Sequence, residues 1–319
     1  MYGVIGGIGS GMLYTTANIA CVYYFDRWRA LASGLATSGS GIGTMFVSLV
    51  CNYIDIKYGP KGYFIAICLI SSMTIIFALF ASPITHNKEE ERKLVTPMEN
   101  GPASKYDSDT NQEEIDNGTL RNTLILLKDK RMVLYCMVHM LYELAYYQPI
   151  VYLPELMTKD HGISREWSGT IISVLGFFYM AGKILTGLIV QYLTISPIML
   201  SAANMGLIGI CFIGFTFCTT YVHFVIVTVA FSPMLASIGV LTPLIIIEIF
   251  GDEKLKDGFG LIMIGKVLST VWGPPIGGAL KDYSAKYNFT FYAASAFQFI
   301  GSFINILVCL FHYNQKRLK

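Results

Sequence analysis

The sequence predicts an all-α protein that crosses a membrane many times. Of its 319 residues, 54% are hydrophobic and 14% are charged, against about 45–50% and about 25% in a soluble domain. The mean hydropathy is +0.53, and nine apolar stretches have the length of about 20 residues that crosses a bilayer. One long polar segment, 83–131, follows the third stretch. These observations argue against a soluble enzyme and against a disordered chain.

The nine predicted spans form a group of three and a group of six. They are 1–25, 33–54 and 63–82, followed by 132–154, 168–190, 198–219, 222–247, 258–280 and 290–311. The first stretch does not resemble a signal peptide, because it lacks a basic start and its apolar run is too long. We therefore predict a partial helix bundle over 1–82, a complete six-helix bundle over 132–312 and a tail over 313–319.

The distribution of Lys and Arg predicts the orientation. The first part of the segment 83–131, up to Gly118, is polar, charged and poor in aromatic residues, so we expect 83–131 to be a flexible cytoplasmic linker. The side that would hold this linker and the C-terminus carries 15 of the 23 Lys and Arg, and the opposite loops carry 6. Because Lys and Arg accumulate in cytoplasmic loops, we expect the linker and C-terminus in the cytoplasm and the N-terminus outside. We expect an integral protein of the plasma membrane.

Three charged residues, Glu143, Lys183 and Lys266, fall inside predicted spans. At 1.5 Å per residue they lie about 10–16 Å from the cytoplasmic ends of their helices, in the layer where transporters bind substrates. Three interpretations stay open: an ion pair between Glu143 and one lysine, a substrate or proton role, or lysines that reach the membrane surface. The surplus positive charge favours an anionic substrate. Tyr179, one turn before Lys183, is a substrate contact or a packed aromatic.

Glycines and prolines indicate where helices approach each other and where they bend. Gly3, Gly7 and Gly11, like Gly39 and Gly43, are four residues apart, which allows close helix contact in membranes. The glycine-rich strings lack the preceding strand and the lysine of a phosphate-binding loop, so no nucleotide is expected.

Six prolines are expected to break or kink their helices. They are Pro149, Pro154, Pro233, Pro243, Pro274 and Pro275. Bends at Gln148-Pro149 and at Trp272-Gly273-Pro274-Pro275 suit helices that rock or gate, and they equally suit a static kink.

No catalytic or metal centre is expected. The seven cysteines form no CxxC pair and read as small apolar residues. Cys136 and Cys309 each precede a histidine by three residues, which makes only a weak zinc signal. The five histidines are far apart in sequence, and no Ser/His/Asp arrangement occurs. The near balance of 23 basic and 21 acidic residues argues against nucleic-acid binding. We predict neither an enzyme nor a bound cofactor.

Three strings carry a family resemblance. Residues 24–39 read YFDRWRALASGLATSG, residues 58–62 read YGPKG and residues 273–282 read GPPIGGALKD. In this order they resemble YF-x-[KR]-R-R-x-x-A-x-G-L-A-x-[AS]-G, [YF]-G-W-R-G and G-P-P-x-x-G-x-L-x-D, motifs of the monocarboxylate transporters, a branch of the major facilitator superfamily. The residues singled out in the first string are Asp26, Arg27, Arg29 and Gly34.

The resemblance covers essentially the whole chain. It implies the twelve-helix facilitator fold, here without its first three helices, and a symporter that moves small carboxylates or aromatic amino acids, usually with protons. It also implies the lipid bilayer, a small carboxylate and a single-span ancillary glycoprotein as partners. The family's eighth helix carries Asp and, four residues later, Arg, where this chain has Tyr179 and Lys183. Lysine keeps the charge but lacks the two-pronged fork that matches a carboxylate, and tyrosine removes the acid. Both departures argue against the family's usual coupling of lactate to protons.

Three functions are compared. The first is a secondary-active transporter of small organic anions, with an incomplete sequence, in which Lys183, Tyr179 and Lys266 bind substrate and Glu143 couples protons or pairs with a lysine. The second is a short isoform that does not transport and instead binds or regulates a full-length transporter. The third, a membrane receptor, has no support from a ligand-binding ectodomain. Genomic DNA upstream of Met1 discriminates the first two, because about 100 further residues would encode three more spans.

Overall fold

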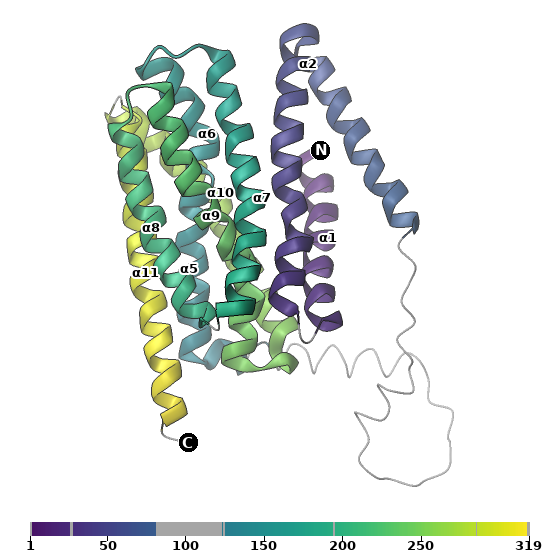
Figure 1. Ribbon diagram of the computed structural model, residues 1–319, viewed down its shortest axis with the longest axis vertical. Helices are drawn as coiled ribbons and strands as arrows, with labels where there is room; N and C mark the ends of the chain where they lie inside the picture. The colour runs from purple at the N-terminus through teal and green to yellow at the C-terminus, as the bar shows by residue number, and fades with distance from the viewer. Residues whose placement is uncertain are drawn as a thin grey trace. The chain divides into compact units, whose positions relative to one another are not determined.

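The protein is helical wherever its computed structural model describes regular structure, and Figure 1 shows the arrangement. The described residues are 2–25, 28–80, 123, 125–193, 195–284 and 286–317. The α-helices are α1 (Tyr2–Tyr24), α2 (Arg29–Phe80), α5 (Lys130–Tyr146), α6 (Gln148–Glu155), α7 (Arg165–Leu193), α8 (Pro197–Phe217), α9 (Tyr221–Phe250), α10 (Leu255–Ser284) and α11 (Asn288–Arg317). A π-helix, η1 (Leu156–Asp160), follows α6, and a short 3-10 helix, η2 (Asp252–Lys254), precedes α10. The predicted all-α class is confirmed.

The chain divides into two compact units. The first contains Met1–Leu49 and Arg121–Lys319, and the second contains Val50–Leu120. Within the described residues, five helices are long and apolar enough to cross a membrane: α7, α8, α9, α10 with the turn before it, and α11. The total of nine spans and the predicted domain boundaries stay predictions.

Helices α5 to α11 share one core. Helices α8 and α9 are apolar on all sides, and their rings interlock with α11: the centroid of Phe212 lies 5.2 Å from that of Phe231 and 6.2 Å from that of Phe291. Side-chain hydrogen bonds join α11 to α8, including one of 2.9 Å from Asn305 Nδ2 to Ser201 Oγ. Close packing and such bonds hold helices together in lipid, where apolar burial gives little advantage.

Asp129 caps the start of α5. Its side chain accepts a hydrogen bond of 2.9 Å from the backbone N–H of Arg131 and forms an ion pair of 2.7 Å with the Arg131 guanidinium. Burial works against the charged carboxylate, but these bonds outweigh it and hold the pKa of Asp129 below its usual value. Just before it, residues 125–128 are helical and Leu126 is buried. The last part of the predicted linker therefore packs on the core.

The prolines act differently from one another. Helix α5 ends at Tyr146 and α6 begins at Gln148, with Pro149 in its first turn, so the chain breaks at this predicted position. Helices α9 and α10 instead continue through their prolines. In α2 the helical backbone is interrupted at Gly59, whose φ of 68° and ψ of −171° suit glycine alone. This interruption falls between the predicted spans 33–54 and 63–82.

Candidate functional site

The structure pairs Glu143 on α5 with Lys266 on α10. Lys266 Nζ lies 2.9 Å from Glu143 Oε1, and both side chains are at most 14% exposed. Glycines on α10 permit this approach: a Cβ added at Gly265 would lie 3.2 Å from Met140 Cγ, and one at Gly273 would lie 3.0 Å from the Leu144 carbonyl. Of the two lysines that the sequence left open as partners of Glu143, the structure brings Lys266 to it.

Lys183 on α7 has polar partners on α2 instead. Its Nζ donates to the Thr37 carbonyl oxygen at 2.9 Å and to Ser40 Oγ at 2.8 Å. It also lies 4.8 Å from the ring centroid of Tyr179, one turn earlier on its own helix. The residue is 3% exposed. The interpretation that Lys183 reaches the membrane surface is therefore wrong, because its ammonium group points into the α2–α7 contact.

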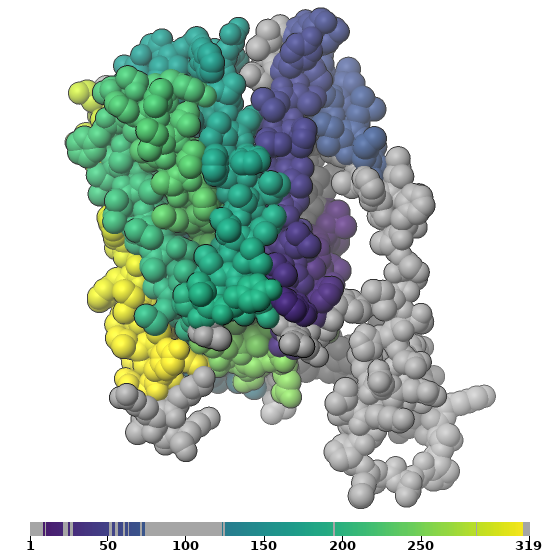
Figure 2. All heavy atoms as spheres, in the orientation of Figure 1, coloured from purple at the N-terminus to yellow at the C-terminus, as the bar shows by residue number. Residues whose placement is uncertain are grey.

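Glycines let α2 and α7 come into backbone contact around Lys183. An added Cβ would lie 2.6 Å from the Lys183 carbonyl at Gly34, 2.6 Å from the Met180 nitrogen at Gly41, and 2.8 Å from the Ala30 carbonyl at Gly187. The surfaces of residues 29–49 and of α7 meet in Figure 2. Small residues of this kind allow close helix crossing in membranes, and here they place backbone carbonyls of α2 within reach of Lys183.

A row of tyrosines connects the two lysines. Lys266 Nζ lies 5.9 Å from the ring centroid of Tyr142, and the rings of Tyr142 and Tyr146 are 5.6 Å apart. The Tyr146 hydroxyl donates to that of Tyr179 at 3.2 Å, and Tyr179 lies beneath Lys183. Aromatic faces attract cations, so the rings of Tyr142 and Tyr179 at the two ends of the row stabilise the two ammonium groups.

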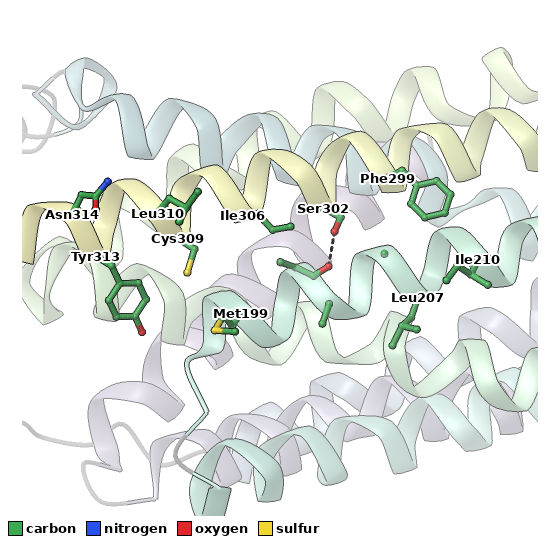
Figure 3. A pocket seen from close by; sticks show the side chains of 13 residues that line it. Met199, Leu207, Ile210, Phe299, Ser302, Ile306, Cys309, Leu310, Tyr313 and Asn314 are labelled. Carbon is green, nitrogen blue, oxygen red and sulfur yellow. Dashed lines mark hydrogen bonds between the residues drawn. The ribbon is translucent and has the colours of Figure 1, made fainter.

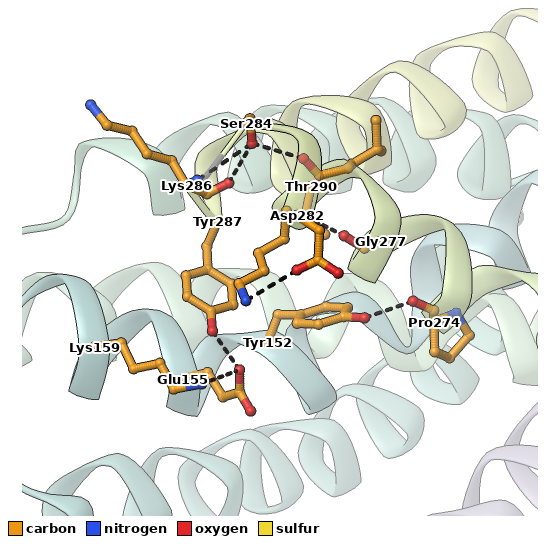
Figure 4. Close-up of polar contacts among 12 residues, drawn as sticks. Tyr152, Glu155, Lys159, Pro274, Gly277, Asp282, Ser284, Lys286, Tyr287 and Thr290 are labelled. Carbon is orange, nitrogen blue, oxygen red and sulfur yellow. Dashed lines mark hydrogen bonds and ion pairs between the residues drawn. The ribbon is translucent and has the colours of Figure 1, made fainter.

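The string GPPIGGALKD is where α6 docks on α10 (Figure 4). Gln148 Nε2 donates to the Gly273 carbonyl at 2.9 Å, and the Tyr152 hydroxyl donates to the Pro274 carbonyl at 2.6 Å. A Cβ at Gly277 would collide with both the Gln148 and the Tyr152 side chains. These two bonds fix α6 against the proline-containing stretch of α10, through which the helix continues. A gating role for this contact stays a prediction.

Polar contacts continue beyond the end of α6. The Tyr287 hydroxyl donates to Glu155 Oε2 at 2.5 Å, and Lys159 lies 3.2 Å from the same oxygen. The hydrogen bond from Tyr287 holds the pKa of Glu155 below its usual value, and Lys159 adds to the effect. Figure 4 shows these side chains converging from α6, η1 and the turn before α11.

A groove of about 1090 Å³ lies between α8 and α11. It contains neither lysine nor Glu143, and its lining is apolar except near Ser302, Tyr313 and Asn314. The Ser302 hydroxyl is already used in a bond of 2.7 Å to the Ala202 carbonyl, as Figure 3 shows. The groove therefore offers no charged partner for a carboxylate, and we do not assign the substrate site to it.

The first family string is only partly described. Asp26 and Arg27 lie outside the described residues. Arg29 Nη1 forms an ion pair of 2.7 Å with Asp252 in η2, and both side chains are partly exposed, so the pair contributes little to stability. Gly34 lies in the α2–α7 crossing.

Comparison with known proteins identifies the family. The model of the Major Facilitator Superfamily matches residues 1–245 and 136–319. The chain belongs to the major facilitator superfamily. Human monocarboxylate transporter 14 is 24% identical to it, over 100% of this chain and 73% of the relative. Monocarboxylate transporter 2 of Mesocricetus auratus is also 24% identical, over 95% of this chain and 64% of the relative.

The fold agrees with this family. The structure of the E. coli fucose:proton symporter superposes with a TM-score of 0.64 and 13% identity, over 94% of this chain and 74% of the symporter. That likeness shows the facilitator fold alone. The resemblance to monocarboxylate transporters indicated by the three strings is confirmed, and these relatives are transporters rather than enzymes.

Sequence reasoning missed the partners of Lys183 and one residue beside the ion pair. Thr37 and Ser40 belong to the run Thr-Ser-Gly-Ser inside an apolar span. This polar run is the sequence feature from which a polar contact at this position could be predicted. His139 has no other histidine near it in sequence, so the histidine pattern gives no signal for it. Its position four residues before Glu143, on the same helix face, was the signal that pointed to it.

Proposed function

We propose that the protein is part of a secondary-active transporter for small organic anions of the monocarboxylate type. Lys183 and Lys266 are its anion contacts, Tyr179 lines the site and Glu143 couples transport to protons. Support comes from the family, from relatives named as monocarboxylate transporters, and from a fold shared with a proton symporter.

The observation that carries the proposal is the electrostatic state of Lys183. It is a buried cation for which the described residues provide a carbonyl, a hydroxyl and an aromatic ring, but no carboxylate. An ammonium group has three N–H donors, and two are used. A buried charge without a counter-ion is unfavourable, and a carboxylate-bearing substrate would supply that counter-ion.

A substrate anion would replace Glu143 as the partner of Lys266. In the structure Glu143 neutralises Lys266. When the Glu143 carboxylate takes up a proton its charge is lost, and Lys266 becomes available to a substrate anion. Proton binding and anion binding then favour one another. The substrate would then pass along the row of tyrosines between Lys266 and Lys183.

The test is substrate uptake by variants of Lys183 in the assembly that transports, at matched surface expression. We expect Lys183→Gln to lose most uptake of labelled lactate, pyruvate or aromatic amino acids, because the anion loses its charged partner. Lys183→Arg should retain or increase uptake, since a guanidinium can bind a carboxylate with two parallel hydrogen bonds.

Lys159→Gln serves as the matched control. Lys159 is exposed, lies beyond the end of α6 and forms an ion pair with Glu155, away from Lys183. This variant should transport as the unmodified protein does. Uptake by Lys183→Gln at the unmodified level would show that Lys183 does not hold the substrate.

An exposed helix face supports a second candidate function. A Cβ added at Gly9, Gly11, Gly39 or Gly43 would meet nothing within 4 Å, and Met12 is 68% exposed. Such a face fits other helices closely. In the first candidate, three further helices of a twelve-helix fold would cover it, leaving nine spans here. In the second, a full-length transporter would cover it and this chain would regulate that partner.

The remaining parts of the proposal concern placement in the cell. We place the protein in the plasma membrane with the linker and the C-terminus in the cytoplasm, on the basis of the Lys and Arg distribution. A single-span ancillary glycoprotein is proposed as a partner from the family resemblance. Protease accessibility of the linker in intact and opened cells would test this orientation.

A further inference from the structure

His139 is a buried residue of α5 that the proposed transport mechanism has not yet used. It is 1% exposed. Its Nε2 lies 3.4 Å from Thr242 Oγ1 on α9, and the Thr242 hydroxyl itself donates to the Ile238 carbonyl at 2.7 Å. With the hydroxyl proton used in this shorter bond, Nε2 is the donor to Thr242 Oγ1. This assigns the hydrogen to Nε2 and leaves Nδ1 with a free lone pair.

That lone pair has no hydrogen-bond partner among the described residues. Leaving a buried polar atom unpaired is unfavourable, and an apolar ring could fill the same space without this penalty. The rings of Tyr135 and Tyr142 pack edge-on against His139, with centroids at 4.8 Å and 6.4 Å. The Tyr142 hydroxyl is bound to the Leu235 carbonyl at 2.8 Å, so it is not available to Nδ1.

The charged groups near His139 are those of the ion pair. Glu143 lies one turn further along α5, where Cβ atoms are about 5–6 Å apart. Lys266 faces both residues from α10. Tyr135 and Tyr142 are the titratable groups that pack against the ring, and on α9 the Thr242 hydroxyl faces it. Glu248, also on α9, acts electrostatically on Tyr135. His139 lies about 6 Å nearer than Glu143 to the Asp129 end of the helix.

We propose that Nδ1 of His139 is the proton acceptor through which Glu143 exchanges its proton with the Asp129 end of α5. This proposal rests on the proposed function. The proton moves from the Glu143 carboxylic acid to the Nδ1 lone pair, which gives a carboxylate and an imidazolium. Lys266 then returns to the Glu143 carboxylate and releases the substrate anion. Nδ1 is out of contact with solvent in this structure. The imidazolium therefore passes its Nδ1 proton to water in a state of the transport cycle that admits water from the Asp129 end, while Nε2 keeps its hydrogen bond to Thr242.

The first experiment does not require transport. The full chain is labelled with ¹⁵N-histidine, and the His139 signals are identified by their loss in His139→Gln, or in His139→Asn if the first variant does not fold. We expect the neutral ring to carry its proton on Nε2. We also expect Glu143→Gln to move the His139 titration midpoint down by about one pH unit or more, because it leaves the Lys266 charge unopposed.

Two controls accompany this measurement. The exposed His223 in the first turn of α9 should not respond to Glu143→Gln, and Glu155→Gln should not move the His139 titration. A ring protonated on Nδ1 when neutral, or a midpoint unchanged by Glu143→Gln, would overturn the proposal.

The second experiment separates a proton role from a structural one. In the assembly that transports, accumulation driven by a pH gradient is compared with substrate exchange at equal pH on both sides. His139→Gln should reduce accumulation on the order of ten-fold more than exchange. Equal loss of both would indicate a packing role and contradict the proposal. If the unmodified protein transports none of the tested anions, the proposed function fails, and the NMR experiment still decides whether His139 accepts the proton.

Discussion

At the scale of single residues, the two buried lysines differ in what neutralises them. Lys266 has a carboxylate at 2.9 Å, whereas Lys183 has a carbonyl, a hydroxyl and a ring. Removing one member of a buried ion pair strands the other charge in a low-dielectric environment, which is far less favourable than removing both. The Glu143–Lys266 pair should therefore show strong coupling between its two members.

A double-mutant cycle measures this coupling. Glu143→Gln and Lys266→Gln should each lower the stability of the folded chain by about 3–5 kcal/mol, and the double variant should recover a large part of that loss. Folded yield and thermal unfolding in detergent are the measurements. The exposed pair Glu155–Lys159 provides the control cycle, with coupling of at most about 1 kcal/mol. Additive losses at Glu143 and Lys266 would exclude a coupled pair.

At the scale of helices, the α2–α7 contact depends on the absence of side chains. A Cβ at Gly41 would lie 2.6 Å from the Met180 backbone nitrogen and 2.8 Å from the Gly176 carbonyl. Backbone atoms cannot move aside as the end of a flexible side chain can. An added methyl group would separate the helices and lengthen the bonds from Lys183 to Thr37 and Ser40.

Gly41→Ala should therefore destabilise the folded chain by about 1–3 kcal/mol, the usual range for overpacking. Gly39→Ala, two residues away, meets nothing within 4 Å and should be neutral or slightly stabilising, because alanine is the better helix former. Thermal unfolding of the two purified variants decides the matter. Equal unfolding temperatures would mean that this crossing is not tight.

Helices and charged residues could be predicted from sequence better than contacts could. Long apolar stretches predict where the helices lie, since length and apolar composition are the main requirements of a membrane-spanning helix. The break at Gln148-Pro149 was predictable because proline removes an N–H. The bonds of Gln148 and Tyr152 to the Gly273 and Pro274 carbonyls were not, because they join two different helices. The partners of Lys183 were not predictable, because one is a backbone carbonyl and carbonyls carry no residue signature.

At the scale of the whole molecule, helices α5 to α11 share one core, and α1 and the first part of α2, up to Leu49, pack against it. Alternating access in this superfamily rocks two bundles about a site between them. Around Gly11, Gly39 and Gly43 the faces of α1 and α2 are open, and Leu35 and Phe46 are more than half exposed. Because no described residue packs against these glycines, we expect that a sealed transport cycle needs a partner surface here.

We therefore predict that residues 1–319 alone do not transport. Without helices against the glycine face, water or lipid would fill the space beside α1 and the first part of α2, and neither an inward-closed nor an outward-closed state could form. Purified protein in liposomes, with labelled lactate, pyruvate and aromatic amino acids, gives the measurement, and a protein-free liposome gives the background. We expect uptake at background for the chain alone, and saturable uptake when helices that cover this face are co-expressed. Saturable uptake by the chain alone would show that α1 and α2 already complete the pathway.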